Sequence, residues 1–350
     1  MDGLSASPVA AFEQHFDQLT ALVLERLGIE LHFRPRGDLD QMEPDLLELV
    51  REFGLLLRVV YRYDLVEALA REVLWYASVL ESRGPGRDAF ALLLDSWIIA
   101  IQGVIKPPEC NILADPLERL RADLERVFVE VETGRGAPAT PDTRMLVERL
   151  IRGDHLSARE LLQARLTAGL APDEMIVGVL LPSMSEIGRR WERNELAVFE
   201  EHLATETVQR LIIGLSSWAI PSERLNRTAL VACVPGDQHG LTPLALGTYL
   251  ELRGWSVRSL GRSLPGAQVV AAAQALSADA IFLSLAMLSR LTEALELVPL
   301  LRGSVPHCPV YVGGRGAIVG RALLEEAGAR LVSNFDEAHR RATETETPHA

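Results

Sequence analysis

In the last third of the chain, short β-rich runs alternate with helical segments. The runs are ALVACV at 229–234, SVRSL at 256–260, AIFLS at 280–284 and PVYVG at 309–313. Strands that alternate with helices in this way form βαβ units, whose strands are parallel. We therefore expect a doubly wound, flavodoxin-like parallel sheet within residues 227–340. Ligands of such sheets bind outside the carboxyl ends of the strands.

Two helical regions precede the expected sheet. Residues 1–133 and 142–222 both carry apolar residues at three- and four-residue spacing, with charged residues between them, which is typical of amphipathic helices. Gly, Pro and Thr are mixed in TGRGAPATPDT at 133–143, and PSERLNRT at 221–228 is also polar, so both segments are predicted to be linkers. The expected fold class is multidomain α and α/β: an N-terminal helical domain, a helical bundle and the parallel sheet.

Charge and composition argue against several functional classes. The net charge of −13 disfavours a direct nucleic-acid surface, which needs basic residues, although an acidic chain can still bind a DNA-binding protein. Three widely separated cysteines suggest a reducing compartment and no zinc site. There is no visible signal peptide and no apolar run of membrane-spanning length, so we expect a cytoplasmic protein without a membrane partner. No catalytic constellation stands out, so an enzyme is not expected.

Three loops at the expected ligand edge carry distinctive residues. Asp237 and His239 follow the first run, Ser284 ends the third, and Gly313-Gly314 follow the fourth. Histidine is the commonest metal-binding side chain, and a carboxylate two residues away can fix its tautomer. Paired glycines let the backbone approach a bulky ligand closely. Because Asp and His are common in such loops, one loop alone would be weak evidence for a binding site.

The spacing of these residues resembles the cobalamin-binding domain of methionine synthase, the corrinoid proteins and the B12 photoreceptors. That family carries Asp/Glu-x-His-x-x-Gly, Ser-x-Leu and Gly-Gly in this order. Here Asp237 to Thr242 is followed by 41 residues, then by Ser284-Leu285-Ala286, then by 26 residues and Gly313-Gly314, which matches the family's register. Thr242 stands where the family has Gly, and Ala286 stands where it has Leu.

The resemblance implies a cobalamin cofactor, with His239 as the metal ligand that binds cobalt from below. The base of the cofactor's nucleotide tail would be displaced and buried between the strands. Thr242 would narrow the cleft for this tail. The residues that the resemblance assigns to the cofactor in this domain are Asp237, His239, Gly240, Leu241, Thr242, Ser284, Leu285, Gly313 and Gly314.

A second motif lies in the bundle. In WERNELAVFEEH, Trp191 is followed by nine residues and then by Glu201-His202. This resembles the Trp-x9-Glu-His signature of the light-sensing cobalamin regulators, of which the carotenoid-gene repressor is the best-known type. The resemblance, which covers about residues 142–338, implies that Trp191, Val198, Glu201 and His202 cap an upper adenosyl group. Taken singly, Trp191 is more typical of a core or interface, and Glu201-His202 of a solvated helix face.

The sequence leaves two main functions open. One is a light- or adenosylcobalamin-responsive sensor that acts on gene expression through a protein partner such as a transcription regulator. The other is a corrinoid carrier of a methyltransferase system, and a B12-binding scaffold with neither activity is a third. Trp191 favours the sensor, because a carrier needs an open upper face. It also favours adenosylcobalamin over methylcobalamin, because a methyl group would leave the tryptophan uncovered. In the best-studied photoreceptors a histidine that captures cobalt follows the tryptophan; here that residue is Glu192, and His202 could serve instead.

The role of residues 1–133 is a separate expectation. They carry no basic recognition helix. In this respect the chain resembles stand-alone antirepressors of photosynthesis genes, which act on another regulator. Long amphipathic helices and an acidic balance suggest a protein-binding or dimerising module, so a second copy of the chain is a further candidate partner.

Overall fold

The computed structural model of this 350-residue chain describes residues 6–32, 43–82, 86–133, 140–193, 195–218 and 222–344. Most of the predicted linker at 133–143, the first residue of the one at 221–228 and the end of the C-terminal tail lie outside the described residues. The chain divides into two compact units. The first is Met1–Gly136 with Arg189–Val198, and the second is Ala137–Gly188 with Phe199–Ala350.

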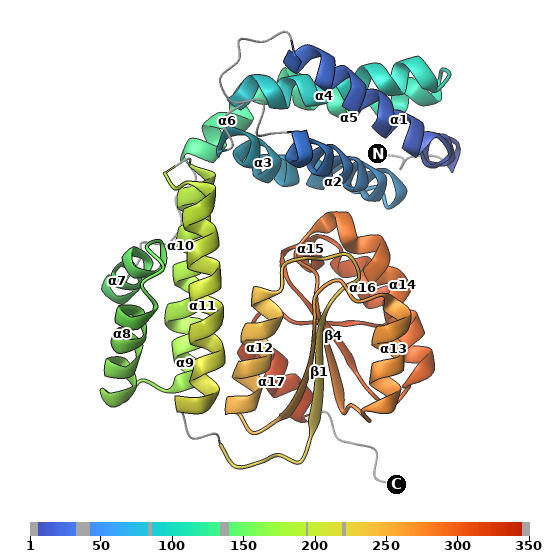
Figure 1. Cartoon of the computed structure of the whole chain (residues 1–350). Coiled ribbons are helices and arrows are strands. Elements are labelled where there is room, and N and C mark those ends of the chain that lie inside the picture. Colours follow the sequence, from blue (N-terminus) through green and yellow to red (C-terminus); the bar gives the residue numbers. More distant parts are fainter. Residues whose placement is uncertain are drawn as a thin grey trace. The chain divides into compact units, whose positions relative to one another are not determined.

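The described part of residues 1–133 is helical, as predicted (Figure 1). Its helices are α1 Ala6–His32, α2 Glu43–Arg62, α3 Val66–Ser82, α4 Gly86–Val104, α5 Glu109–Ala122 and α6 Leu124–Thr133. Aromatic side chains fill much of the core. The rings of Phe12 and Tyr61 meet edge to face at 5.0 Å, and the Tyr61 hydroxyl donates to the carbonyl of Leu113 at 2.7 Å. The indole of Trp97 packs against Gly54, where a side chain would collide with it.

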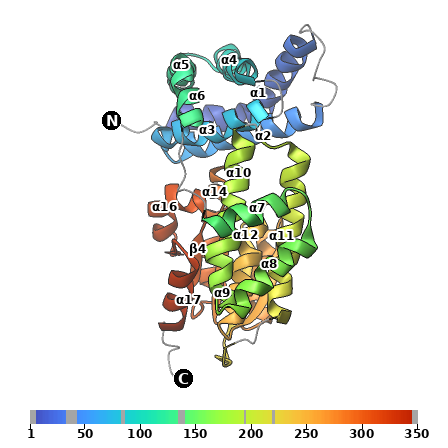
Figure 2. The same cartoon turned by 90° about the vertical axis from the view of Figure 1, so that its left-hand side faces the viewer.

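Helices also make up the region between the two predicted linkers, and α7 and α8 lie along the others in Figures 1 and 2. They are α7 Pro141–Leu150, α8 His155–Thr167, α9 Pro172–Met175, the π-helical turn η1 Ile176–Leu180, α10 Leu181–Glu192 and α11 Val198–Trp218. Side-chain caps fix two of the starts. Thr140 accepts from the amide of Thr143, and Asp154 accepts from the amide of Ser157.

The π-helical turn has a local cause. The amide of Leu181 donates to the carbonyl of Ile176, five residues back instead of four. Pro182 follows directly, and its ring cannot donate to the preceding turn and clashes with the carbonyl four residues earlier. The wider turn relieves this clash, and the hydroxyl of Ser183 donates to the Val179 carbonyl at 2.7 Å.

The C-terminal region contains a parallel sheet with strand order β2-β1-β3-β4-β5, the flavodoxin-like order (Figure 1). Its strands are β1 Thr228–Cys233, β2 Ser256–Gly261, β3 Ala280–Ser284, β4 Val310–Gly313 and β5 Arg330–Leu331. The prediction of a doubly wound parallel sheet is therefore confirmed. The fifth strand was not predicted from the sequence, because two residues are too few to show a β pattern.

Helices cover both faces of the sheet. They are α12 Leu241–Leu252, α13 Gly266–Ala275, α14 Leu291–Ser304, α15 Arg315–Val319, α16 Arg321–Glu326 and α17 Phe335–Glu344, with a 3-10 turn η2 at Leu288–Arg290. Helices α12 and α17 lie on one face, and α13 and α14 on the other (Figure 1). Within the described ranges, no helix is long and apolar enough to cross a membrane.

The strand register brings the predicted motifs together. Cys233 at the end of β1 pairs with Ser284 at the end of β3, and Ser284 pairs with Gly313 at the end of β4. Strands β1 and β3 are neighbours, but the chain leaves them toward opposite sides of the sheet, to β2 and to β4. Such a switch point opens a crevice at the carboxyl edge.

Candidate functional site

The loop from β1 to α12 is short and turns sharply. Gly236 has a φ of +80°, which side chains rarely adopt, and the amide of Asp237 donates to the Val234 carbonyl at 3.1 Å. The side chain of Arg290 lies against Gly236, about where a β-carbon would point. The turn therefore directs the Asp237 side chain inward, where only 1% of the residue is exposed.

Asp237 holds His239 by two hydrogen bonds. One carboxylate oxygen, Oδ1, lies 2.8 Å from the ring Nδ1 of His239 and accepts from its backbone amide at 3.0 Å. Because a carboxylate accepts, we assign the proton to Nδ1, which leaves the lone pair on Nε2. A neutral imidazole with a lone pair on Nε2 is the form that binds a metal, and a carboxylate on the other nitrogen is its usual support. The structure contains the hydrogen bond expected between these two side chains, and the role of His239 as a metal ligand stays a prediction.

The second oxygen of Asp237 reaches a different loop. Oδ2 accepts from the amide of Ala286 at 2.7 Å and from the amide of Met287 at 3.4 Å. Burial raises the pKa of Asp237, but the hydrogen bonds that its carboxylate accepts from His239 and Ala286 outweigh the effect of burial, so the net pKa is lowered. The carboxylate is therefore charged at neutral pH and links the loops that follow β1 and β3.

Cys233, the last residue of β1, is a second metal-binding residue type near this loop. Its thiol lies 3.8 Å from the carbonyl oxygen of His239. Burial, followed by the charge of Asp237, raises the pKa of Cys233 to about 12. A thiol that stays protonated at neutral pH is a poor metal ligand, so the chemistry of this edge rests on the histidine.

The paired glycines make room for another loop rather than only for a ligand. Gly314 has a φ of +115°, and a β-carbon on it would overlap the carbonyl oxygen of Leu285. The amide of Leu285 donates to the Gly313 carbonyl at 2.8 Å, and the Leu285 carbonyl accepts from Gly316 at 3.1 Å. In the structure the group that approaches these glycines is the Ser284-Leu285-Ala286 segment, and their close approach to a ligand stays a prediction.

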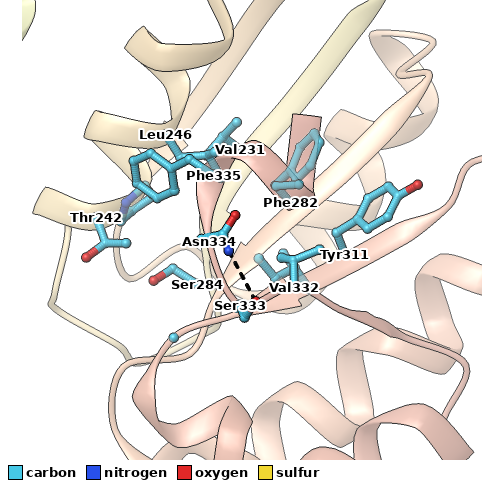
Figure 3. Close-up of a pocket in the computed structure, with 15 residues that line it drawn as sticks. Val231, Thr242, Leu246, Phe282, Ser284, Tyr311, Val332, Ser333, Asn334 and Phe335 are labelled. Atoms are coloured by element: carbon cyan, nitrogen blue, oxygen red, sulfur yellow. Dashed lines mark hydrogen bonds between the residues drawn. The ribbon is translucent and has the colours of Figure 1, made fainter. Parts of the chain in front are cut away.

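A pocket of about 170 Å³ opens between the sheet, α12 and the start of α17 (Figure 3). Its walls are mostly apolar, and Thr242 and Ser284 contribute hydroxyl-bearing side chains to the lining. The Ser284 hydroxyl is buried and has no hydrogen-bond partner among the described residues. The lining residues are Val231, Thr242, Pro243, Leu246, Phe282, Leu283, Ser284, Tyr311, Gly313, Gly314, Val332, Ser333, Asn334, Phe335 and Ala338.

This pocket fits the base of a cobalamin tail. A flat aromatic group matches the apolar walls, and a nitrogen on it would give the unpartnered Ser284 hydroxyl the hydrogen bond that a buried polar group requires. Of the residues predicted from the sequence, Thr242 also lines the pocket, Gly240 caps α12 and Leu241 begins that helix. This domain therefore offers a histidine held by a carboxylate and an apolar pocket with an unpartnered hydroxyl, the two features that the resemblance assigns to a corrinoid site.

The sequence reasoning missed the wall that α17 supplies. Phe335 and Ala338 belong to α17, and Asn334, which also lines the pocket, caps that helix by accepting from the Glu337 amide at 2.8 Å. The signal was present, because Asn334 and Glu337 have the spacing of a helix start. Without the fifth strand, however, nothing in the sequence placed this helix beside the first motif.

The bundle residues are only partly brought together. On α11, the Glu201 carboxylate lies 3.0 Å from Nδ1 of His202 and accepts from the Thr205 hydroxyl at 2.7 Å. Trp191 and Val198 belong to the first compact unit, whereas Glu201 and His202 belong to the second. A joint role for the four residues therefore stays a prediction.

Two family models match the chain, and both are described as a B12 binding domain. They cover residues 143–213 and 227–338. The first corresponds to the bundle and the second to the sheet domain, so cobalamin binding is assigned to this part of the chain.

Named relatives fall into two groups. The HTH-type transcriptional repressor CarH of Myxococcus xanthus is 28% identical over 69% of this chain and 79% of its own length. CarA, also an HTH-type transcriptional repressor of M. xanthus, is 33% identical over 46% of this chain, which spans about half (54%) of CarA. The dimethylamine corrinoid protein of Methanosarcina barkeri is 26% identical over 50% of this chain and 84% of its own length.

Among solved structures, the monomethylamine corrinoid protein of Methanosarcina barkeri has the same fold. Its TM-score is 0.51 at 20% identity, and the match covers 58% of this chain and 97% of that one.

Proposed function

Since its two B12-binding domains make this chain a member of the cobalamin-binding proteins, we propose that it is a cobalamin-dependent regulatory sensor. The state of the upper axial ligand, set by light or by the supply of adenosylcobalamin, would be passed to a protein partner that regulates gene expression. This proposed role requires no catalytic step by the protein. Both repressors and corrinoid proteins are relatives, so the choice between sensor and carrier depends on residues in the bundle.

In this proposal each residue on the lower side of the site has a separate role. His239 would be the lower ligand of cobalt through Nε2, and Asp237 would hold its ring in the required tautomer. The pocket beside Ser284 and Thr242 would take the base of the tail. When bound, the cofactor supplies a cobalt centre whose upper ligand can be exchanged, and it is this ligand that a sensor must distinguish.

The observation that carries the sensor proposal is the Trp191, Glu201 and His202 pattern in the bundle. A tryptophan over the upper face would obstruct the methyl acceptor of a carrier, but it suits a protein that registers what occupies that face. Glu201 presents a carboxylate that is already fixed by Thr205 and His202. Such a fixed acceptor could select a ribose hydroxyl, which adenosylcobalamin has on its upper ligand and methylcobalamin lacks.

The test is an absorbance spectrum of protein reconstituted with adenosylcobalamin or methylcobalamin, recorded in the dark and after illumination. We expect both forms to bind, adenosylcobalamin more tightly, and light to remove this preference. Size-exclusion chromatography before and after illumination should show a change in oligomer size or bundle packing. Equal affinity for both forms, with no hydrodynamic change in light, would contradict the sensor and favour the corrinoid carrier.

A matched pair of variants sharpens this test. Trp191→Ala should remove much of the preference for adenosylcobalamin, because a buried aromatic contact contributes about 1 kcal/mol beyond its area. Trp255→Phe is the control, because Trp255 lies in the sheet domain and contacts His339 there. Its preference for adenosylcobalamin should equal that of the parent protein.

The photoproduct is expected to differ from that of the best-studied photoreceptors. Glu192 occupies the position at which those proteins have the cobalt-capturing histidine. Replacing Glu192 with His should change the spectrum after illumination while leaving the dark spectrum as it was. Identical spectra after illumination would exclude this position as the one that contacts cobalt.

A further inference from the structure

One guanidinium in the second unit joins three helices. Nε of Arg253, just after the end of α12, donates to the Asp173 carboxylate of α9 at 2.6 Å. A terminal nitrogen of the same side chain lies 3.4 Å from the Asp336 carboxylate of α17. The guanidinium also stacks over the ring of Tyr249, 5.2 Å from its centre. The bundle and the sheet domain are therefore both bound to one arginine.

The branch toward α17 reaches the pocket. The Tyr249 hydroxyl donates to the Asp336 carboxylate at 2.5 Å, and the Tyr249 ring lies 5.6 Å from that of Phe335. Phe335 and Ala338 of α17 line the pocket, and so do Thr242 and Leu246 of α12. Asp336 and Phe335 are neighbours in the chain, so the carboxylate that Arg253 contacts moves with the pocket wall.

The branch toward α9 reaches the bundle. The Asp173 side chain is only 14% exposed, so its contact with Arg253 is shielded from solvent on the carboxylate side. A second tie joins the bundle to α12, because the Ser216 hydroxyl of α11 donates to Glu251 at 3.1 Å. The second tie does not involve Asp336, Phe335 or the pocket.

We infer that Arg253 couples occupation of the tail pocket to the attachment of the helical bundle, as a positioning residue shared by both. This rests on the proposed cobalamin site. An aromatic base that enters between α12 and α17 must fit against Phe335, and any shift of Phe335 carries Asp336 with it. The Arg253 guanidinium contacts both Asp336 and Asp173, so a movement of Asp336 changes the geometry of the hydrogen bond to Asp173. Such coupling is reciprocal, so release of the bundle must change the affinity for the tail by the same factor.

The protonation states suit a permanent link. Burial opposes charge on Arg253, but its hydrogen bond with Asp173 and the neighbouring charges outweigh this, so its pKa is raised. Burial, and then the hydrogen bond to Asp336, raise the pKa of Tyr249, so its hydroxyl stays a donor. Arg253 therefore stays charged and Tyr249 stays neutral at neutral pH, so contacts between these two groups and their partners change through geometry.

The experiment compares two ligands: cobalamin, and cobinamide, which has the corrin but no nucleotide tail. Hydrogen exchange is measured in the full-length protein at the amides of α9 and η1, residues 173–180, since Pro172 has no amide hydrogen. In the parent protein we expect cobalamin to change exchange there about fivefold more than cobinamide, the lower end of typical coupling. Failure of the parent protein to take up either corrinoid would refute the cobalamin site itself, and uptake is read separately from the visible spectrum.

Three variants locate the effect. In Arg253→Gln and in Asp336→Asn, cobalamin and cobinamide should change hydrogen exchange at residues 173–180 to the same extent. Both variants should still bind cobalamin. Asp336→Asn is the milder change, since that side chain is 68% exposed and its loss should not unfold the protein. Ser216→Ala is the control, because it loosens the bundle without touching the pocket branch, and it should keep the difference between ligands. The inference is wrong if folded Asp336→Asn and Arg253→Gln proteins show the same difference in hydrogen exchange between cobalamin and cobinamide as the parent protein.

Discussion

The Asp237 carboxylate lies 2.7 Å from the backbone nitrogen of Ala286, so one buried side chain holds together the loops after β1 and β3. Its other oxygen holds the ring of His239. The position of the imidazole is thus fixed by the same group that fixes the Ser284-Leu285-Ala286 segment. Ala286 departs from the family's leucine, yet the bond is unaffected because it is made by the main chain.

Removal of this carboxylate should destabilise the sheet domain. Asp237→Ala leaves the amides of Ala286 and His239 without their acceptor, and each buried unsatisfied donor costs about 1–3 kcal/mol. Urea denaturation should therefore show a loss of at least about that size. Glu325→Ala, which alters an exposed pair with Arg321, is the control and should change stability by less than about 0.5 kcal/mol.

The same carboxylate predicts a pH dependence. Its pKa is lowered in the fold, so its contribution to stability is complete above the unfolded value, about 3.9 for Asp, and is lost as pH falls through the folded pKa. Asp237→Asn should flatten the stability profile below about pH 4. If the acid limb has the same slope in the parent and the variant, this group is not the one that titrates.

Loss of the lower ligand should be visible in the spectrum. His239→Ala should give bound cobalamin a base-off spectrum, since the pocket still retains the tail while cobalt loses its nitrogen ligand. Acid should act in the same direction on the parent protein, because a ligating imidazole must be unprotonated. An unchanged spectrum at full occupancy would show that another group is the ligand.

Two glycines with positive φ offer a matched comparison. Gly314→Ala puts a methyl group into the Leu285 backbone, whereas Gly261, with a φ of +72°, has no neighbouring atom within 4 Å of its β-carbon position. Both positions have a positive φ, which costs a residue with a side chain about 1–3 kcal/mol. Only Gly314→Ala should also displace the Ser284 loop, so it alone should lose cobalamin, as measured by equilibrium dialysis.

A histidine of α17 that does not line the pocket should contribute to the pH dependence of stability. Nδ1 of His339 accepts from the indole nitrogen of Trp255 at 3.1 Å, and burial, followed by the charge of Arg253, lowers the pKa of His339. A depressed pKa means that stability is complete above the unfolded value, about 6.5, and falls as pH decreases below it. His339→Asn retains an acceptor but cannot be protonated, so its unfolding free energy should be less sensitive between about pH 6.5 and 5.

The sequence predicted the parts of the site that depend on local pattern. Strand runs were visible for β1 to β4, and the spacing of the motifs put Asp237, Ser284 and Gly313 at one edge. The contact between Asp237 and Ala286 joins residues 49 positions apart, and no periodicity encodes it. The pocket wall formed by α17 was missed because β5, the strand before it, is only two residues long. So short a strand is defined by its pairing with β4, which is a tertiary interaction that the sequence pattern does not show.

The π-helical turn at Ile176–Leu180 bears on how chains of this kind should be aligned. A turn closed by a bond to the fifth residue back holds one residue more than an α-helical turn, while each α-helical residue rotates the chain by about 100°. The wider turn takes up the extra residue. Met175 before the turn and Ile187 after it are therefore both buried. A homologous chain whose helix runs unbroken through this point would have one residue fewer, and its alignment gap belongs inside this turn.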